Sequence, residues 1–281
     1  AGNKGNSYKS EKFTIDKTAP VLNVSFDNNS VENGNFYKDT RKATITVSEK
    51  NFNPSLVNLE GSGSLGGWSS NGNIHTASIV FDKDGEYEFS VNLSDKATNN
   101  STNFGSGKFI VDKTMPSLSI KGVQDGVSYK KSVGFEVALS DDNIDVGRSS
   151  VSLSGRSIGE VGLIGGFNGN GGIFTFKGVS EEEKYDDLYT LKAVIYDKAG
   201  NCEEKVVNYS INRFGSKYAM MNERILNKVI RVAEDVVLEE YSVDRLDLNA
   251  SKVAVIKDGK DLEVPKDLYT IEESGGVDSN W

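Results

Sequence analysis

Cysteine and histidine are almost missing from this sequence. Its 281 residues include one cysteine, Cys202, and one histidine, His75. A single cysteine excludes a disulfide within the chain and a zinc site built on cysteines. A Ser-His-Asp triad, a Cys-His pair or a multi-histidine metal site would each depend on His75. The common kinds of active site therefore lack their residues, and we expect a protein without enzymatic activity.

Long apolar runs and an excess of positive charge are missing as well. No apolar run approaches the roughly 20 residues that a membrane helix needs. The formal net charge is −9, and an acidic surface repels phosphate backbones. We therefore expect a chain that neither inserts into a membrane nor binds nucleic acid. It opens with AGNKGNSYKS and without a signal peptide, which predicts an internal fragment of a longer protein.

Turn-forming residues and two repeated phrases are what the sequence has in abundance. The 29 glycines, with many Asn, Asp and Ser, suit short strands separated by turns. FTIDKTAP at 13–20 recurs as FIVDKTMP at 109–116, 96 positions later. DKATN at 95–99 recurs as DKAGN at 197–201, 102 positions later. A unit of about 100 residues therefore repeats along the chain.

Alternating apolar residues recur at the same spacing. Tyr87, Phe89, Val91 and Leu93 correspond to the second-copy residues Tyr189, Leu191, Ala193 and Ile195. This period of two is typical of a half-buried strand. Each unit offers about seven such segments, separated by Gly, Asn and Asp at spacings of roughly ten residues, which predicts an antiparallel β-sandwich.

Tyr87 and Tyr189 favour an immunoglobulin-like version of that sandwich. Each follows an aspartate at the entrance to the penultimate strand, the place of the tyrosine corner, whose hydroxyl bonds to the backbone upstream. Phe89 and Leu191 stand where antibody domains carry a disulfide cysteine. Burying a large apolar side chain stabilises by about 1.5–3 kcal/mol, so packing can replace the bridge.

The phrases DKTxP and DKAGN, in phase and about a hundred residues apart, resemble the bacterial Ig-like tandem repeats of Firmicutes cell-surface and secreted proteins. The resemblance covers residues 1 to about 213. It implies an all-β fold of tandem immunoglobulin-like antiparallel β-sandwiches and an extracellular location, secreted or at the cell surface. It supplies no catalytic residues.

Four segments follow from the repeat. Residues 1–15 are predicted to be the terminal strand of a preceding Ig-like unit, 16–111 the first domain, 112–213 the second, and 214–281 an incomplete further unit. In that last, partial β unit, Asn222–Glu234 has apolar residues at helical spacing, which leaves a short helix and an edge strand as alternatives. Asp258-Gly259 between two apolar runs predicts a hairpin.

The DKTxP phrases are interpreted as linkers. Pro20 and Pro116 each start a new strand, where a missing N–H costs nothing. Asp16 and Asp112, with the following threonines, are placed to hydrogen-bond the turn.

Calcium is the alternative role for these carboxylates. The pairings considered are Asp112 with Asp95 or Glu49, and Asp197 with Asp141 and Asp142, because hard cations bind several carboxylate and carbonyl oxygens. No D-x-D-x-D loop is present, so we expect the aspartates to brace turns. The candidate calcium ligands are Asp16, Asp95, Asp112, Asp141, Asp142 and Asp197. No other cofactor is expected.

Two unequal loops are the remaining candidates for binding. Trp68 lies in a Gly/Ser-rich segment and is interpreted as a lid over the sandwich edge, with sugar stacking as the alternative. The segment Gly159–Gly172 lacks the GKS or GKT ending of a phosphate-binding loop, so we expect a flexible loop. Asp95 and Asp197 recur in each unit, which favours a scaffold role over catalysis.

These observations predict a non-catalytic stalk or spacer segment of an extracellular bacterial surface protein. Its partners would be neighbouring Ig-like repeats of the same chain. One alternative is an adhesin or carbohydrate-binding module that contacts a host or cell-surface protein or glycan. The other is an accessory β-domain of a secreted glycoside hydrolase.

Overall fold

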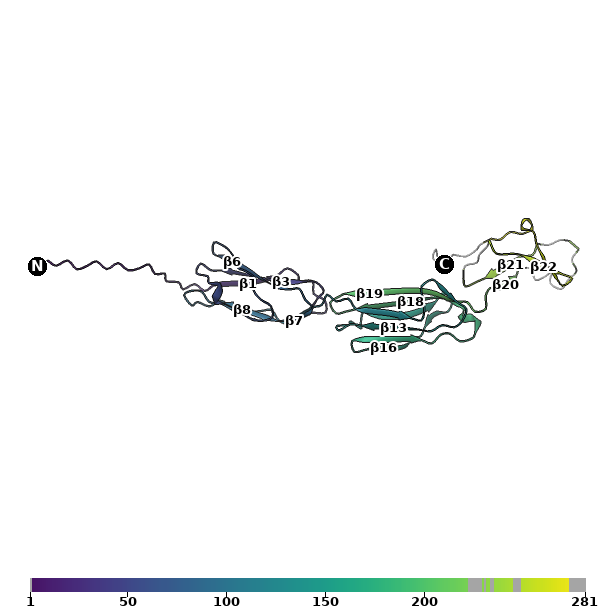
Figure 1. The fold of residues 1–281 in the computed structure, drawn as a ribbon, viewed down its shortest axis with the longest axis horizontal. Helices are drawn as coiled ribbons and strands as arrows, with labels where there is room; N and C mark the ends of the chain where they lie inside the picture. Colours follow the sequence, from purple (N-terminus) through teal and green to yellow (C-terminus); the bar gives the residue numbers. More distant parts are fainter. Residues whose placement is uncertain (1, 222–228, 230, 233–234, 245–248, 273–281) are drawn as a thin grey trace. The chain divides into compact units, whose positions relative to one another are not determined.

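The computed structural model describes residues 2–221, 229, 231–232, 235–244 and 249–272. Its regular structure is almost entirely strands (Figure 1). The contacts divide the chain into two units. Unit 1 holds Ala1–Met115 together with Asp197–Asn201, and unit 2 holds Pro116–Tyr196 and Cys202–Trp281. Within the described ranges, no helix is long and apolar enough to cross a membrane.

Unit 1 contains a β-sandwich. One sheet has the strand order β1 (Val21–Phe26), β3 (Arg41–Ser48), β6 (Ile74–Phe81) and β5 (Ser69–Asn71). The other side has two three-stranded sheets. The first has the order β4 (Val57–Gly61), β8 (Phe89–Leu93) and β9 (Phe104–Gly105). The second has the order β2 (Phe36–Tyr37), β10 (Phe109–Val111) and β7 (Gly85–Tyr87). A short 3-10 helix, η1 (Pro54–Leu56), leads into β4.

The core of unit 1 is built from the apolar residues that occur at every second position of its strands. Along β3 every second residue is buried, with Ala43, Ile45 and Val47 fully enclosed. Along β8 the buried residues are Phe89, Val91 and Leu93, and they join the same core cluster. The alternation that the sequence shows therefore turns one face of each strand inward.

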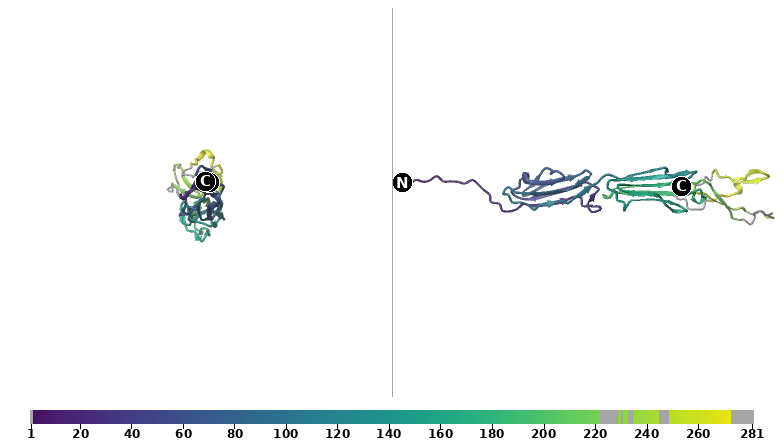
Figure 2. Two further views of the ribbon diagram at one scale, coloured as in Figure 1. Left: turned by 90° about the vertical axis from the view of Figure 1, so that its left-hand side faces the viewer. Right: turned by 90° about the horizontal axis from the view of Figure 1, so that it is seen from below.

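Unit 2 repeats this two-sheet arrangement, with two ten-residue strands, β18 and β19, in its second sheet; Figure 2 shows it from further directions. One sheet has the order β11 (Ser117–Lys121), β13 (Phe135–Ser140), β17 (Gly171–Phe176) and β16 (Ile164–Asn168). The other has β12 (Val127–Tyr129), β19 (Cys202–Ile211), β18 (Asp187–Tyr196), β14 (Ser150–Gly155) and β15 (Gly159–Val161). The 3-10 helix η2 (Glu183–Tyr185) precedes β18.

In both sandwiches an early short strand pairs in parallel with the last strand of that sandwich, β2 with β10 and β12 with β19. The other strand pairs among the described residues are antiparallel. Two packed sheets closed in this way form an immunoglobulin-like sandwich. The prediction of an all-β fold with tandem Ig-like sandwiches is confirmed.

The prediction of a flexible loop at Gly159–Gly172 is wrong. The segment holds β15, β16 and the start of β17, joined by a turn with Gly169 at φ 57°. A Cβ on Gly165 would lie 2.0 Å from the carbonyl oxygen of Ile173 on the paired strand. Glycine here lets two paired strands approach closely. Because glycine is also common in flexible loops, composition alone cannot distinguish the two roles.

Beyond the second sandwich, the described residues form two antiparallel strand pairs and the 3-10 helix η4 (Lys266–Leu268). β20 (Lys217–Met220) pairs with β21 (Leu238–Tyr241), and β22 (Ala254–Lys257) pairs with β23 (Lys260–Glu263). The predicted Asp-Gly hairpin is confirmed, because Asp258 and Gly259 have φ 52° and 73°, as a type I′ turn requires. The helix-or-strand alternative at Asn222–Glu234 lies outside the described residues, apart from 229, 231 and 232.

Residues 2–20 form no strand in this structure. The assignment of 1–15 to such a unit, and the other predicted domain boundaries, stay predictions.

Candidate functional site

The DKAxN turns are built around a buried aspartate. In the first copy, Asp95 accepts hydrogen bonds from the backbone N–H groups of Ala97 (2.8 Å) and Asn99 (2.9 Å). It also accepts one from Asn99 Nδ2, at 2.8 Å. In the second copy, Asp197 accepts from the backbone N–H (2.7 Å) and Nδ2 (2.6 Å) of Asn201. Both aspartates are fully buried, so their oxygens serve the turn.

The variable residue of the DKAxN phrase takes a left-handed conformation in both copies. Thr98 has φ 69° and Gly200 has φ 90°. Glycine adopts this region without cost, whereas a β-branched residue is strained there. The first turn holds its shape despite that strain, because Asp95 binds the residues on both sides of Thr98.

The asparagine of each turn also reaches a DKTxP linker. Asn99 Nδ2 donates to the backbone oxygen of Asp16 at 3.3 Å, and Asn201 Nδ2 donates to that of Asp112 at 2.9 Å. The same two phrases therefore meet twice, through the same atoms. This contact explains why they stay in phase along the sequence.

Each linker aspartate also caps its own turn. Asp16 Oδ1 accepts from the N–H of Thr18 at 3.0 Å, and Asp112 Oδ1 accepts from the N–H of Thr114 at 3.2 Å. The following prolines, Pro20 and Pro116, are buried and directly precede β1 and β11. This is the bracing geometry that the sequence predicts for a linker.

A cluster of three carboxylates lies at the first linker. Asp16, Glu49 and Asp95 each offer an oxygen, and these oxygens lie within 4.8 Å of one another. Glu49 and Asp95 are buried. Burial opposes the charge of Asp95, but the turn's hydrogen bonds hold its pKa below the ordinary value. Carboxylates gathered in this way are ligands that calcium prefers, so these residues could hold that ion.

The predicted pairing of Asp112 with Asp95 or Glu49 is wrong. Asp16 takes that place, because each linker meets the DKAxN turn found one domain further along the chain. Asp112 instead contacts the second turn through Asn201.

Of the remaining calcium candidates, Asp112 and Asp197 belong to unit 1. Burial, with a smaller contribution from the charge of Asp112, raises the pKa of Asp197 above its ordinary value. Asp141 belongs to unit 2 and accepts from the N–H of Asn143 at 2.7 Å. Asp142 is exposed and joins no carboxylate group among the described residues.

Both predicted tyrosine corners have the expected bond. Tyr87 donates its hydroxyl hydrogen to the carbonyl of Lys83 at 2.8 Å, and Tyr189 donates to that of Tyr185 at 2.7 Å. Each acceptor lies four residues upstream, so the loops before β7 and β18 are fastened to the strands that follow them.

Trp68 packs on the first sandwich and is half-buried. Its ring meets Phe52 edge-on at 4.8 Å, and Phe52 stacks on His75 at 4.3 Å. His75 is held by Ser70 Oγ at 2.7 Å and by the carbonyl oxygen of Glu49 at 2.8 Å. The single histidine is thus a hydrogen-bonded residue packed against Phe52, which separates it from the tryptophan. Cys202, a free thiol, is half-buried on β19.

Sequence reasoning missed Arg41, a cation in the core of unit 1. Its guanidinium lies 3.7 Å from the ring centre of Phe26, 4.1 Å from that of Tyr37 and 4.7 Å from that of Phe109. Only 7% of the residue is exposed, and burial lowers its pKa. A signal was present, since Arg41 is in phase with the buried Ala43, Ile45 and Val47.

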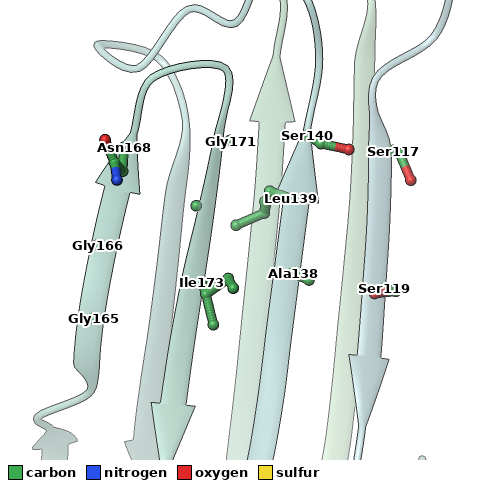
Figure 3. A pocket seen from close by; sticks show the side chains of 11 residues that line it. Ser117, Ser119, Ala138, Leu139, Ser140, Gly165, Gly166, Asn168, Gly171 and Ile173 are labelled. Atoms are coloured by element: carbon green, nitrogen blue, oxygen red, sulfur yellow. The ribbon is translucent and has the colours of Figure 1, made fainter.

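A shallow groove of about 640 Å³ crosses the open face of the sheet β11-β13-β17-β16 (Figure 3). Small residues such as Ser117, Ser119, Ala138 and Gly166 line it, and the lining includes no charged or aromatic side chain. The groove therefore has neither an acid-base pair for catalysis nor a platform for sugar stacking.

The paired sheets and tyrosine corners define this protein as an array of Ig-like sandwiches. Residues 75–212, just under half of the chain, match the model of the family described as bacterial Ig-like domain (group 3). The match runs from β6 of the first sandwich to the end of the second.

Solved structures with some likeness include the fibronectin(III)-like modules of Clostridium thermocellum CbhA. They are 13% identical, with 67% of this chain and 93% of that chain covered and a TM-score of 0.28. The Yersinia pseudotuberculosis adhesin InvE is 15% identical, with 69% and 60% covered and a TM-score of 0.27. These scores are low, so the fold assignment rests on strand pairing. No curated protein matches the sequence.

Proposed function

We propose that this chain is a non-catalytic spacer segment of an extracellular bacterial surface protein, in which tandem Ig-like units hold other modules at a distance. The observation that carries the proposal is the repeated contact between turn and linker, Asn99 with Asp16 and Asn201 with Asp112. A turn that binds a linker through the same atoms each time is an element that can repeat along a series of units.

The surroundings of the buried aspartates support a scaffold role. Asp95 and Asp197 direct their oxygens at backbone and asparagine donors of their own turns. An aspartate acting as a general base would instead face the proton that it removes from a substrate.

The spacer role is tested by the distance distribution between two spin labels. Cysteines introduced at the exposed Lys42 and Lys177, with Cys202 replaced by serine, carry the labels. We expect a narrow distribution that broadens in Asn201→Ala, because the linker loses its contact with the turn. Asn103→Ala, at an exposed position, is the control and should leave the width unchanged. A parent distribution as broad as that of Asn201→Ala would overturn the spacer proposal.

The adhesin and carbohydrate-binding alternatives rest on the region around Trp68. They are tested with the same chain on a glycan array and on cells. We expect no binding above background, since Trp68 is half-buried and its ring packs edge-on against Phe52. A specific signal that disappears in Trp68→Ala, with the fold intact, would favour a binding module. A neighbouring catalytic domain in the full reading frame would favour the accessory role.

A further inference from the structure

An aspartate at the entrance to each tyrosine corner lies against the chain that leaves the same sandwich. Asp84 precedes Tyr87 and Asp186 precedes Tyr189, at the repeat spacing of 102 positions. Neither was a candidate in the sequence. We propose that these aspartates form an exit clamp, which holds the first linker residues after the last strand. The inference rests on the proposed spacer function and names the residues that stiffen its linkers.

The second clamp is the more complete. Asp186 Oδ2 accepts from the backbone N–H of Arg213 and from that of Phe214 at 3.0 Å. Asp186 Oδ1 accepts from Arg213 Nε at 2.7 Å. The exposed fractions of the two side chains are 8% and 6%, so this ion pair is shielded from water. One carboxylate thereby binds both the backbone and the side chain of the linker.

The rest of the arginine reaches the same loop. Its Nη1 donates to the carbonyl of Ser180 at 2.8 Å, and Nη2 donates to that of Glu182 at 2.9 Å. The Tyr189 hydroxyl bond to Tyr185 fastens this loop to β18. The clamp therefore stands on a segment that the sandwich already holds in place.

The first clamp has the same plan with a lysine. Asp84 Oδ1 accepts from the backbone N–H of Lys113 at 2.8 Å, and Oδ2 accepts from the hydroxyl of Thr114. Lys113 Nζ folds back to the carbonyl of Asp82 at 3.0 Å. In both copies, a cationic residue two positions after the strand, Lys113 after β10 and Arg213 after β19, binds the loop that carries the aspartate.

The two clamps differ in strength. A guanidinium donates several hydrogen bonds in a fixed plane, whereas an ammonium is a compact charge that stays well hydrated. Arg213 is enclosed, and Lys113 is exposed. The linker that leaves the second sandwich is therefore held more firmly than the one that leaves the first.

Amide hydrogen exchange on the whole chain tests the clamp. We expect the amides of Arg213 and Phe214 to be protected, and Asp186→Ala to speed their exchange by about tenfold or more, as for the loss of hydrogen bonds to a charged group. Asp186→Asn, which keeps one acceptor oxygen, should have an intermediate effect. The core amide of Leu191 reports whether unit 2 stays folded.

Glu181→Ala is the matched control. Glu181 also faces Arg213, at 3.6 Å from Nη1, but it is 93% exposed, and its removal should leave exchange unchanged. The clamp is overturned if Arg213 and Phe214 exchange as fast in the parent as in Asp186→Ala while Leu191 stays protected. The exchange experiment uses no ligand, so the two proposals fail separately. Specific binding on the glycan array would overturn the spacer proposal and leave the exit clamp standing. Rapid exchange of the Arg213 and Phe214 amides would overturn the clamp and leave the spacer proposal standing.

Discussion

Tyr189 and Tyr209 stack ring on ring in unit 2 at 5.4 Å, but their hydroxyls differ. The Tyr189 hydroxyl has a backbone acceptor, whereas the hydroxyl of Tyr209 is a buried group without a hydrogen-bond partner. An unpaired buried polar group costs free energy, and a net hydrogen bond contributes about 0.5–1.5 kcal/mol. Removing the hydroxyl from each tyrosine in turn therefore compares a hydrogen-bonded buried oxygen with an unbonded one.

We expect Tyr189→Phe to lower the free energy of unfolding by about 1 kcal/mol, and Tyr209→Phe to leave it unchanged or raise it. Urea denaturation followed by fluorescence measures both. The ring packing is kept in each variant, so a difference reports the hydroxyl alone. A larger loss for Tyr209→Phe than for Tyr189→Phe would contradict the assignment of the corner bond.

Arg41 gives a second prediction at the residue scale. Its guanidinium contacts three aromatic rings, and Nε donates to the carbonyl of Asn28 at 3.1 Å. Lysine cannot reproduce planar stacking, so Arg41→Lys should lower the free energy of unfolding by about 1–2 kcal/mol. Lys42→Ala, on the exposed face of the same strand, should stay within about 0.5 kcal/mol of the parent. Equal effects of the two substitutions would contradict the buried role of Arg41.

At the scale of the element, the first exit linker should respond to acid. The hydroxyl of Thr114 contributes most to lowering the pKa of Asp84 below its ordinary value of 3.8, and the Lys113 N–H adds to it. A carboxylate with a lowered folded pKa contributes stability above its unfolded pKa, and that contribution is lost as the pH falls through the folded value. The linker should therefore stay clamped until the pH is below the ordinary aspartate range.

The measurement is the amide chemical shift of Lys113 during an acid titration. It should report a midpoint below 3.8, the ordinary value for aspartate, and this transition should vanish in Asp84→Asn. Asp82, whose carbonyl rather than carboxylate binds the linker, supplies the control variant Asp82→Asn, which should keep the transition. A midpoint above 3.8 would contradict the arrangement of hydrogen bonds around Asp84.

For the whole molecule, the prediction concerns calcium at the first linker. Asp16, Glu49 and Asp95 bring their oxygens together, yet Asp16 and Glu49 already accept from Asn51, and Asp95 accepts from its own turn. We expect the bracing role, with a thermal unfolding midpoint that is the same in calcium and in chelator. A midpoint that rises with calcium, and no longer does so in Glu49→Gln, would establish an ion site instead.

The strands were predictable wherever the relevant signal is local. Alternation every second residue marks β8 and β18, and Asp258-Gly259 marks its hairpin, because backbone geometry is set by neighbouring residues. The glycine-rich segment 159–172 was misjudged, since glycine suits a loop and a close strand contact equally well, and only the paired strand decides between them.

The sequence by itself determined the fold class, the length of the repeat and the two tyrosine corners, since these depend on periodicity and on residues close together in the chain. The tertiary structure decided which distant groups meet. Asp16, and not Asp112, lies beside Asp95. Arg41 lies among three aromatic rings, and Asp186 binds Arg213. Sheet pairing brings these partners together across many residues, and one sequence contains no record of distances in space.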